Sequence, residues 1–167
     1  SNTFSTNGST SLINIDLTET RFNTVNMYGS SNIEKIILSN CSELSTLDFL
    51  SASDISKLDL ENCSKFTEQM VLSKDYFSES PTINMPGSGI TVISIDELDL
   101  TNIKYPGGMT ELTITNSPNG GELDLSEYTS LSSLTLDSCG NLTGLKTHTD
   151  ITTLDLKSCV NLTGSYD

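Results

Sequence analysis

The stretch Leu131-Ser132-Ser133-Leu134-Thr135-Leu136-Asp137-Ser138-Cys139-Gly140-Asn141-Leu142 decides the fold of this chain. Its pattern is Leu-x-x-Leu-x-Leu-x-x-Cys-x-x-Leu, with Ile or Phe accepted at apolar positions. The same pattern recurs without a gap from Ile33, Ile55 and Ile151. Residues two apart in a strand point to the same face, so the central Leu-x-Leu of each copy predicts a short strand with two inward side chains.

Half-copies with the same rhythm lie between the full copies. Those that begin at Phe22 and Leu44 carry a small residue in place of the cysteine. Two full copies begin 22 residues apart, at Ile33 and Ile55, so one coil holds two similar halves. A fixed period of this length is typical of stacked repeats. We therefore predict an all-β solenoid of about seven coils of 20–22 residues, with parallel strands on both sides.

The repeat resembles the leucine-rich repeat family, in particular the secreted bacterial type whose units read Leu-Thr-x-Leu-Asp-Leu-Ser-x-Cys-x-x-Leu. The copies that begin at Leu131 and Ile151 match this unit most closely, and the resemblance extends from Leu12 to Leu162. It implies a leucine-rich repeat fold and a recognition role outside the cell or at the bacterial cell surface.

The cysteine-bearing halves are expected on one side of the coil, side A, and the other halves on side B. Side A would hold the inward pairs Ile15/Leu17, Ile36/Leu38, Leu58/Leu60, Ile83/Met85, Leu112/Ile114, Leu134/Leu136 and Leu154/Leu156. Side B would hold Val25/Met27, Leu47/Phe49, Met70/Leu72, a stretch within 93–100, Leu123/Leu125 and Leu145.

The chain divides into a polar N-terminal segment or cap, 1–11, and the solenoid, 12–167. No capping sequence follows Leu162. An uncovered terminal coil exposes apolar corners and strand edges, so we expect a contact there with a neighbouring domain or with the chain itself.

The template is interrupted by irregular insertions at 67–89 and 103–108. Within the first insertion, 69–77 can be read as a bulged strand or as a short helix. The segment 90–100 reads as one longer strand with a bulge, and Pro106 with its two following glycines makes 103–108 an extended, projecting turn.

Composition narrows the class of partner. Eight Lys and Arg face 22 Asp and Glu, which gives a formal net charge of −14. A chain this acidic repels phosphate backbones, so nucleic acid is not an expected partner. No apolar run reaches the roughly 20 residues of a membrane span, so no membrane insertion is expected.

The cysteines favour a structural role. Cys41, Cys63, Cys139 and Cys159 occupy one repeat position, the inward corner after the strand, which favours buried free thiols over disulfides or a zinc site. The only histidine, His148, lies in a polar corner and reads as a turn residue. We expect no enzyme activity, no cofactor and no metal site.

The leading functional hypothesis is a non-enzymatic module that recognises a protein or a glycan. The alternatives are a spacer or stalk within a larger surface protein, and a calcium-dependent polysaccharide-binding solenoid. Candidate binding residues are outward positions of side A and two tyrosines of the irregular segments. They are Lys35, Ile37, Lys57, Asp59, Glu111, Thr113, Tyr76 and Tyr105.

Overall fold

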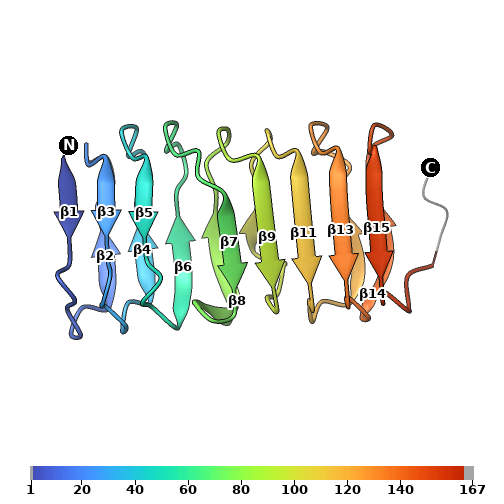
Figure 1. The fold of residues 1–167 in the computed structure, drawn as a ribbon, viewed down its shortest axis with the longest axis horizontal. Helices are drawn as coiled ribbons and strands as arrows, with labels where there is room; N and C mark the ends of the chain where they lie inside the picture. Colours follow the sequence, from blue (N-terminus) through green and yellow to red (C-terminus); the bar gives the residue numbers. More distant parts are fainter. Residues whose placement is uncertain (1, 164–167) are drawn as a thin grey trace.

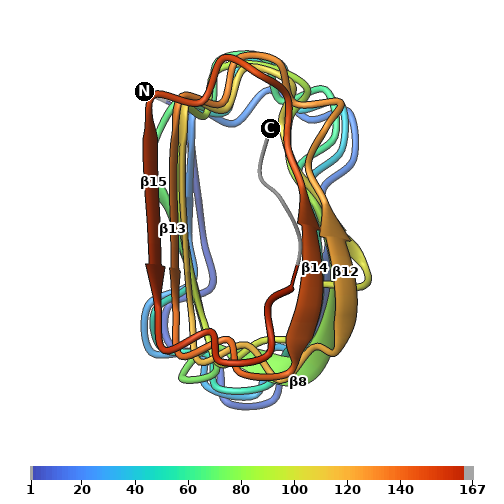
Figure 2. The same ribbon diagram turned by 90° about the vertical axis from the view of Figure 1, so that its right-hand side faces the viewer.

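The computed structural model describes residues 2–163 and shows a stack of flattened coils. Each coil contributes one strand to either side of an elongated cross-section (Figures 1 and 2). Strand numbers alternate between the two sides, so we call them the odd face and the even face. The predicted all-β solenoid of about seven coils is confirmed.

The odd face consists of β1 (Thr3–Ser5), β3 (Thr24–Asn26), β5 (Thr46–Asp48), β7 (Met70–Ser73), β9 (Val92–Asp96), β11 (Glu111–Thr115), β13 (Ser133–Asp137) and β15 (Thr153–Lys157). The even face consists of β2 (Asn14–Asp16), β4 (Lys35–Ile37), β6 (Ile55–Asp59), β8 (Phe77–Asn84), β10 (Ile103–Lys104), β12 (Gly121–Asp124) and β14 (Leu142–Lys146). Every ladder between neighbouring strands is parallel, as predicted.

The core lies between the two faces and is built from the repeat positions. Ile36, Leu38, Leu58 and Leu60 are fully buried, and Ile36 lies directly opposite Leu58 in the β4–β6 ladder. Each such side chain contributes about 1.5–3 kcal/mol by leaving water. The inward apolar pair of the template therefore holds successive coils together.

The corner after each cysteine-type strand has one conformation throughout. The residue before each cysteine is left-handed, with φ of 61° at Asn40, 61° at Asn62, 58° at Ser138 and 53° at Ser158. This turn directs the next side chain inward. Three of the cysteines are buried there, and Cys159, in the last described coil, is partly exposed.

The prediction that all cysteine-type halves share one side is wrong. The strands β4 and β6, which precede Cys41 and Cys63, lie on the even face. The strands β13 and β15, which precede Cys139 and Cys159, lie on the odd face. The coil phase therefore slips by one half-coil in the middle of the chain.

The slip arises because 90–108 contains two half-coils where the pattern predicts one strand and a turn. Ile93 and Ile95 belong to β9, which pairs with β7 and β11 on the odd face. The chain then crosses to the even face, where β10 pairs with β8. The expectation of one bulged strand over 90–100 is therefore wrong. Within 103–108, Ile103–Lys104 is a strand and Tyr105 and Pro106 are buried, so the expected turn is confined to Gly107 and Gly108, where the Met109 amide donates to the Pro106 carbonyl oxygen.

The segment 69–77 forms a strand and a turn instead of the short helix. Met70 and Leu72 are buried and Val71 between them is exposed, which is the two-residue alternation of a strand. Met70 lies opposite Ile93 and Leu72 opposite Ile95 in the β7–β9 ladder. Residues 2–163 contain no helix, and hence none that could cross a membrane.

Each face is interrupted once. On the odd face the ladder β1-β3-β5 is separate from the ladder that begins at β7, and on the even face the ladder that ends at β10 is separate from β12-β14. The second interruption shapes the candidate site described below.

Candidate functional site

Four of the predicted binding residues lie together on the even face. Lys35 pairs in register with Lys57, and Ile37 pairs with Asp59, in the β4–β6 ladder. Lys35 is exposed and the other three are half-buried. Sequence reasoning therefore placed this quartet on one surface.

Glu111 and Thr113 do not join that surface. Both lie on β11, on the odd face, where Thr113 pairs with Ser94 on one side and with Thr135 on the other. The expectation that they share a face with Lys35 and Lys57 is wrong, because the half-coil slip moves every later cysteine-type strand to the opposite face.

The two tyrosines support the packing of the core. The ring of Tyr76 lies edge-on to Phe49 with their centroids 6.2 Å apart. Tyr105 is only 8% exposed, and its ring lies edge-on to Tyr128 at 5.6 Å. Burial raises the pKa of the Tyr105 phenol. The sequence predicts that Tyr105 projects from the surface, and this prediction is wrong. The buried ring cannot stack on a ligand.

The repeated aspartates and the single histidine serve the corners. Asp16 Oδ1 accepts hydrogen bonds from the hydroxyl and amide of Thr18, which lower the pKa of the Asp16 carboxyl. Asp124 makes the same turn with Ser126. His148 Nε2 lies 2.7 Å from the Leu131 carbonyl oxygen. Its Nδ1 accepts a hydrogen bond from the Asp150 amide at 3.1 Å, a local contact that agrees with the predicted turn role. Within residues 2–163, no three His, Cys, Asp or Glu side chains gather to hold a metal ion.

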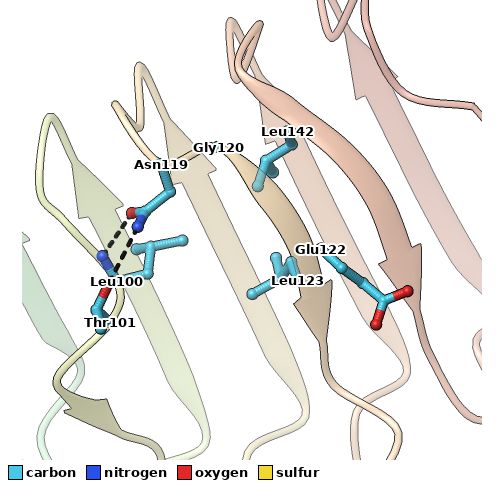
Figure 3. Close-up of a pocket in the computed structure, with 7 residues that line it drawn as sticks. All are labelled: Leu100, Thr101, Asn119, Gly120, Glu122, Leu123 and Leu142. Carbon is cyan, nitrogen blue, oxygen red and sulfur yellow. Dashed lines mark hydrogen bonds between the residues drawn. The ribbon is translucent and has the colours of Figure 1, made fainter.

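A hollow of about 250 Å³ occupies the interruption between β10 and β12 (Figure 3). Because β10 and β12 form no backbone hydrogen bonds with each other, no ladder holds the two adjacent coils at strand spacing here. The residues that line the hollow are Leu100, Thr101, Asn119, Gly120, Glu122, Leu123 and Leu142. The three leucines make part of this lining apolar, so we call it the apolar hollow.

Asn119 bridges the interruption. Its Oδ1 accepts a hydrogen bond from the Leu100 amide at 2.6 Å, and its Nδ2 donates to Thr101 Oγ1 at 3.3 Å (Figure 3). The same Nδ2 donates to Asp99 Oδ1 at 2.8 Å. The side chain thereby replaces the missing strand ladder between the two coils and fixes the edge of the hollow.

A second hollow of about 260 Å³ adjoins the first and shares Asn119 and Gly120 with it. Its other lining residues are Glu79, Ser80, Asp99 and Pro118, so we call it the acidic hollow. Hydrogen bonds from Thr101 chiefly, then from Asn119 and Ser80, lower the pKa of the Asp99 carboxyl to about 2. Asp99 is therefore a carboxylate at any pH near neutrality.

Sequence reasoning missed both hollows. The signal in the sequence is the run Ser117-Pro118-Asn119-Gly120-Gly121, whose turn-forming residues lengthen one corner between two template strands. The run predicts an irregular corner, but not that Asn119 reaches back to Leu100.

Comparisons with protein-family models, curated proteins and solved structures find no match for this chain.

Proposed function

We propose that this chain is a non-enzymatic, leucine-rich repeat recognition module that binds a protein or a glycan at the bacterial cell surface. The observation that carries the proposal is the in-register presentation of outward side chains on two flat faces, as in the pairs Lys35/Lys57 and Thr113/Thr135. Parallel strands hold these groups about 4.8 Å apart on a rigid support, which reduces the entropy lost when a ligand binds.

The quartet on β4 and β6 is the best candidate for contact with a ligand. Lys35 and Lys57 are like charges in adjacent strands, and within residues 2–163 neither forms an ion pair. Like charges directly opposite each other destabilise a sheet. An anionic group of the ligand would relieve this repulsion, and Ile37 beside it adds apolar contact.

The test is a binding screen of the purified chain against arrays of extracellular proteins and glycans. The double variant Lys35→Glu/Lys57→Glu should weaken a saturable interaction at least tenfold, whereas Thr113→Lys on the opposite face should leave it within twofold. Both variants must keep the wild-type melting temperature within a few degrees.

A screen without any saturable ligand would overturn the recognition proposal and favour the spacer alternative. Binding that requires calcium, with a melting temperature that rises specifically with calcium, would favour the polysaccharide-binding alternative.

A further inference from the structure

Two large apolar side chains project into solvent from the same corner of adjacent coils. Tyr28 is 71% exposed and Leu50 is 61% exposed. Each lies two residues after a member of the pair Asn26/Asp48, which is in register in the β3–β5 ladder of the odd face (Figure 1). Tyr28 and Leu50 therefore follow one another along the stack, and we call them the Tyr28 patch.

The corner turn itself does not require apolar residues. The amide of Tyr28 donates to Asn26 Oδ1 at 2.8 Å, and the amide of Leu50 donates to Asp48 Oδ1 at 3.2 Å. Four other corners make the same turn with a polar residue in this position, namely Thr18, Glu61, Thr101 and Ser126. Exposed apolar surface is unfavourable in water. The turn therefore gives no reason for the patch, whereas contact with another molecule would give one.

A hollow of about 420 Å³ lies beside Tyr28. Three of its polar residues, Ser5, Asn26 and Asp48, are in register on β1, β3 and β5, so a hydroxyl, an amide and a carboxylate follow one another about 4.8 Å apart. The full lining is Ser5, Asn7, Gly8, Asn26, Tyr28, Gly29 and Asp48. The two glycines leave that part of the wall to the backbone. The hollow thus places a polar column next to the apolar patch.

The polar column has both donors and acceptors to spare. Asn26 Oδ1 accepts from the Tyr28 amide, and Asn7 Oδ1 accepts from the Ser5 hydroxyl at 3.2 Å. Within residues 2–163, neither Asn26 Nδ2 nor Asn7 Nδ2 donates a hydrogen bond, and Asp48 Oδ2 accepts none. A ligand for this hollow must therefore both accept and donate, as a sugar hydroxyl does.

The charge of the hollow selects against anionic ligands. Asp48 is the one carboxylate among the lining residues, and none of them is Lys, Arg or His. A phosphate, a sulfate or a uronic acid would meet this carboxylate and the net charge of −14 without a cation to pair with. The chemistry of the hollow therefore favours an uncharged sugar.

We propose that the Tyr28 patch and its hollow bind a neutral sugar ring of a glycan. One face of such a ring carries mainly C–H groups and lies on Tyr28 and Leu50, while the hydroxyls at its edge reach the Asn26 amide and the Asp48 carboxylate. Covering the aromatic ring and the C–H face removes apolar surface of both partners from water. This inference rests on the proposed recognition function, names the class of glycan, and adds a contact surface on the odd face.

The experiment is an amide NMR titration of the full chain with neutral and anionic oligosaccharides. The neutral probes are cellotetraose, mannotetraose and chitotetraose in its fully N-acetylated form, and the anionic probe is tetragalacturonate. A capped Gly-Phe-Gly peptide tests the patch as a contact for protein. The expected result is saturable shifts of the Tyr28, Gly29 and Leu50 amides with a neutral sugar, and none with tetragalacturonate or the peptide.

Three variants test the two parts of the site. Tyr28→Thr installs the residue that Thr18 and Thr101 provide at other corners, and it should weaken sugar binding about tenfold or more, whereas Tyr28→Phe keeps the ring and should stay within about threefold of wild type. Asp48→Asn retains an Oδ1 acceptor for the turn and should weaken binding about threefold.

Val71→Thr is the matched control. Val71 is also apolar and 50% exposed on the odd face, but it does not line the hollow, so its replacement should leave the affinity within about twofold of wild type. Thermal melts of all four variants report any loss of folding separately from loss of binding.

Absence of saturable shifts with the neutral sugars, or equal affinity of Tyr28→Thr and Val71→Thr, would overturn the sugar site. Saturable shifts with the peptide alone would also overturn it and would assign the patch to a protein partner. The recognition function would fail separately: a ligand from the array screen that binds Tyr28→Thr as tightly as wild type keeps that function and overturns only the role of the patch.

Discussion

The thiol of Cys63 donates a hydrogen bond to the carbonyl oxygen of Leu38 in the preceding coil, across 3.0 Å. Cys41 makes the same contact with Leu17. Cys139, which follows a strand of the odd face, makes a longer contact with Ile114 in its own preceding coil. The cysteine therefore joins successive coils at their corners, and its role is the same on whichever face its strand lies.

Replacing Cys63 with alanine should destabilise the chain by about 1–3 kcal/mol, because the substitution leaves a small cavity and removes the hydrogen bond to Leu38. The measurement is urea unfolding followed by circular dichroism. Cys159→Ala is the control, since Cys159 is partly exposed, and it should cost less than about 1 kcal/mol. Equal losses in the two variants would contradict the structural role assigned to the buried thiol.

Stability should fall at alkaline pH partly because of Cys63. Burial raises the pKa of its thiol from the ordinary value of 9.0 to about 11. Below about pH 9 the thiol is protonated in both the folded and the unfolded chain; between pH 9 and 11 it ionises first in the unfolded chain, so the free energy of unfolding declines. The decline measured from pH 8 to pH 11 should be smaller in Cys63→Ala, and identical slopes would refute this linkage.

The left-handed corner predicts an unusual effect of glycine. Ser138 has φ of 58°, a conformation that costs a non-glycine residue about 1–2 kcal/mol. Ser138→Gly removes this cost but also adds conformational entropy to the unfolded chain, so the net stabilisation should be roughly 0.5–1 kcal/mol. Ser138→Val should destabilise the chain. Thr135 lies in β13, the strand that directly precedes Ser138. In thermal melts, Thr135→Gly should lower the melting temperature, whereas Ser138→Gly should raise it.

The half-coil slip can be tested by fluorescence. Pyrene attached at Ser94→Cys and Thr113→Cys should give excimer emission, because these residues are paired in adjacent strands of the odd face. Pyrene at Asn84→Cys and Thr113→Cys should give none, because β8 and β11 lie on opposite faces.

A Cys159→Ala background prevents labelling of the exposed native thiol in both pairs. Excimer emission from the Asn84/Thr113 pair would contradict the half-coil slip and support the sequence-based prediction that all cysteine-type halves lie on one side of the coil.

The sequence predicts the solenoid, its parallel strands and its inward residues, because the repeat positions of pairs such as Leu58 and Leu60 follow directly from a period of two within a period of about 20. The faces could not be assigned through the middle of the chain, because β10 is a strand of only two residues, Ile103 and Lys104, followed by a tyrosine and a proline that read as a turn. The hollows could not be predicted either, because Asn119 acts through a contact with the preceding coil that no spacing encodes.

The half-coil slip also bears on how such a chain can change. The cysteine corners on the odd and even faces use the same left-handed residue and the same thiol contact, at Asn62 and Cys63 as at Ser138 and Cys139. Each half-coil thus fits the stack from either side. Duplication or loss of a single half-unit in the gene would transfer every outward residue downstream to the other face while leaving its inward neighbours intact, so a surface could be rearranged without redesigning the core.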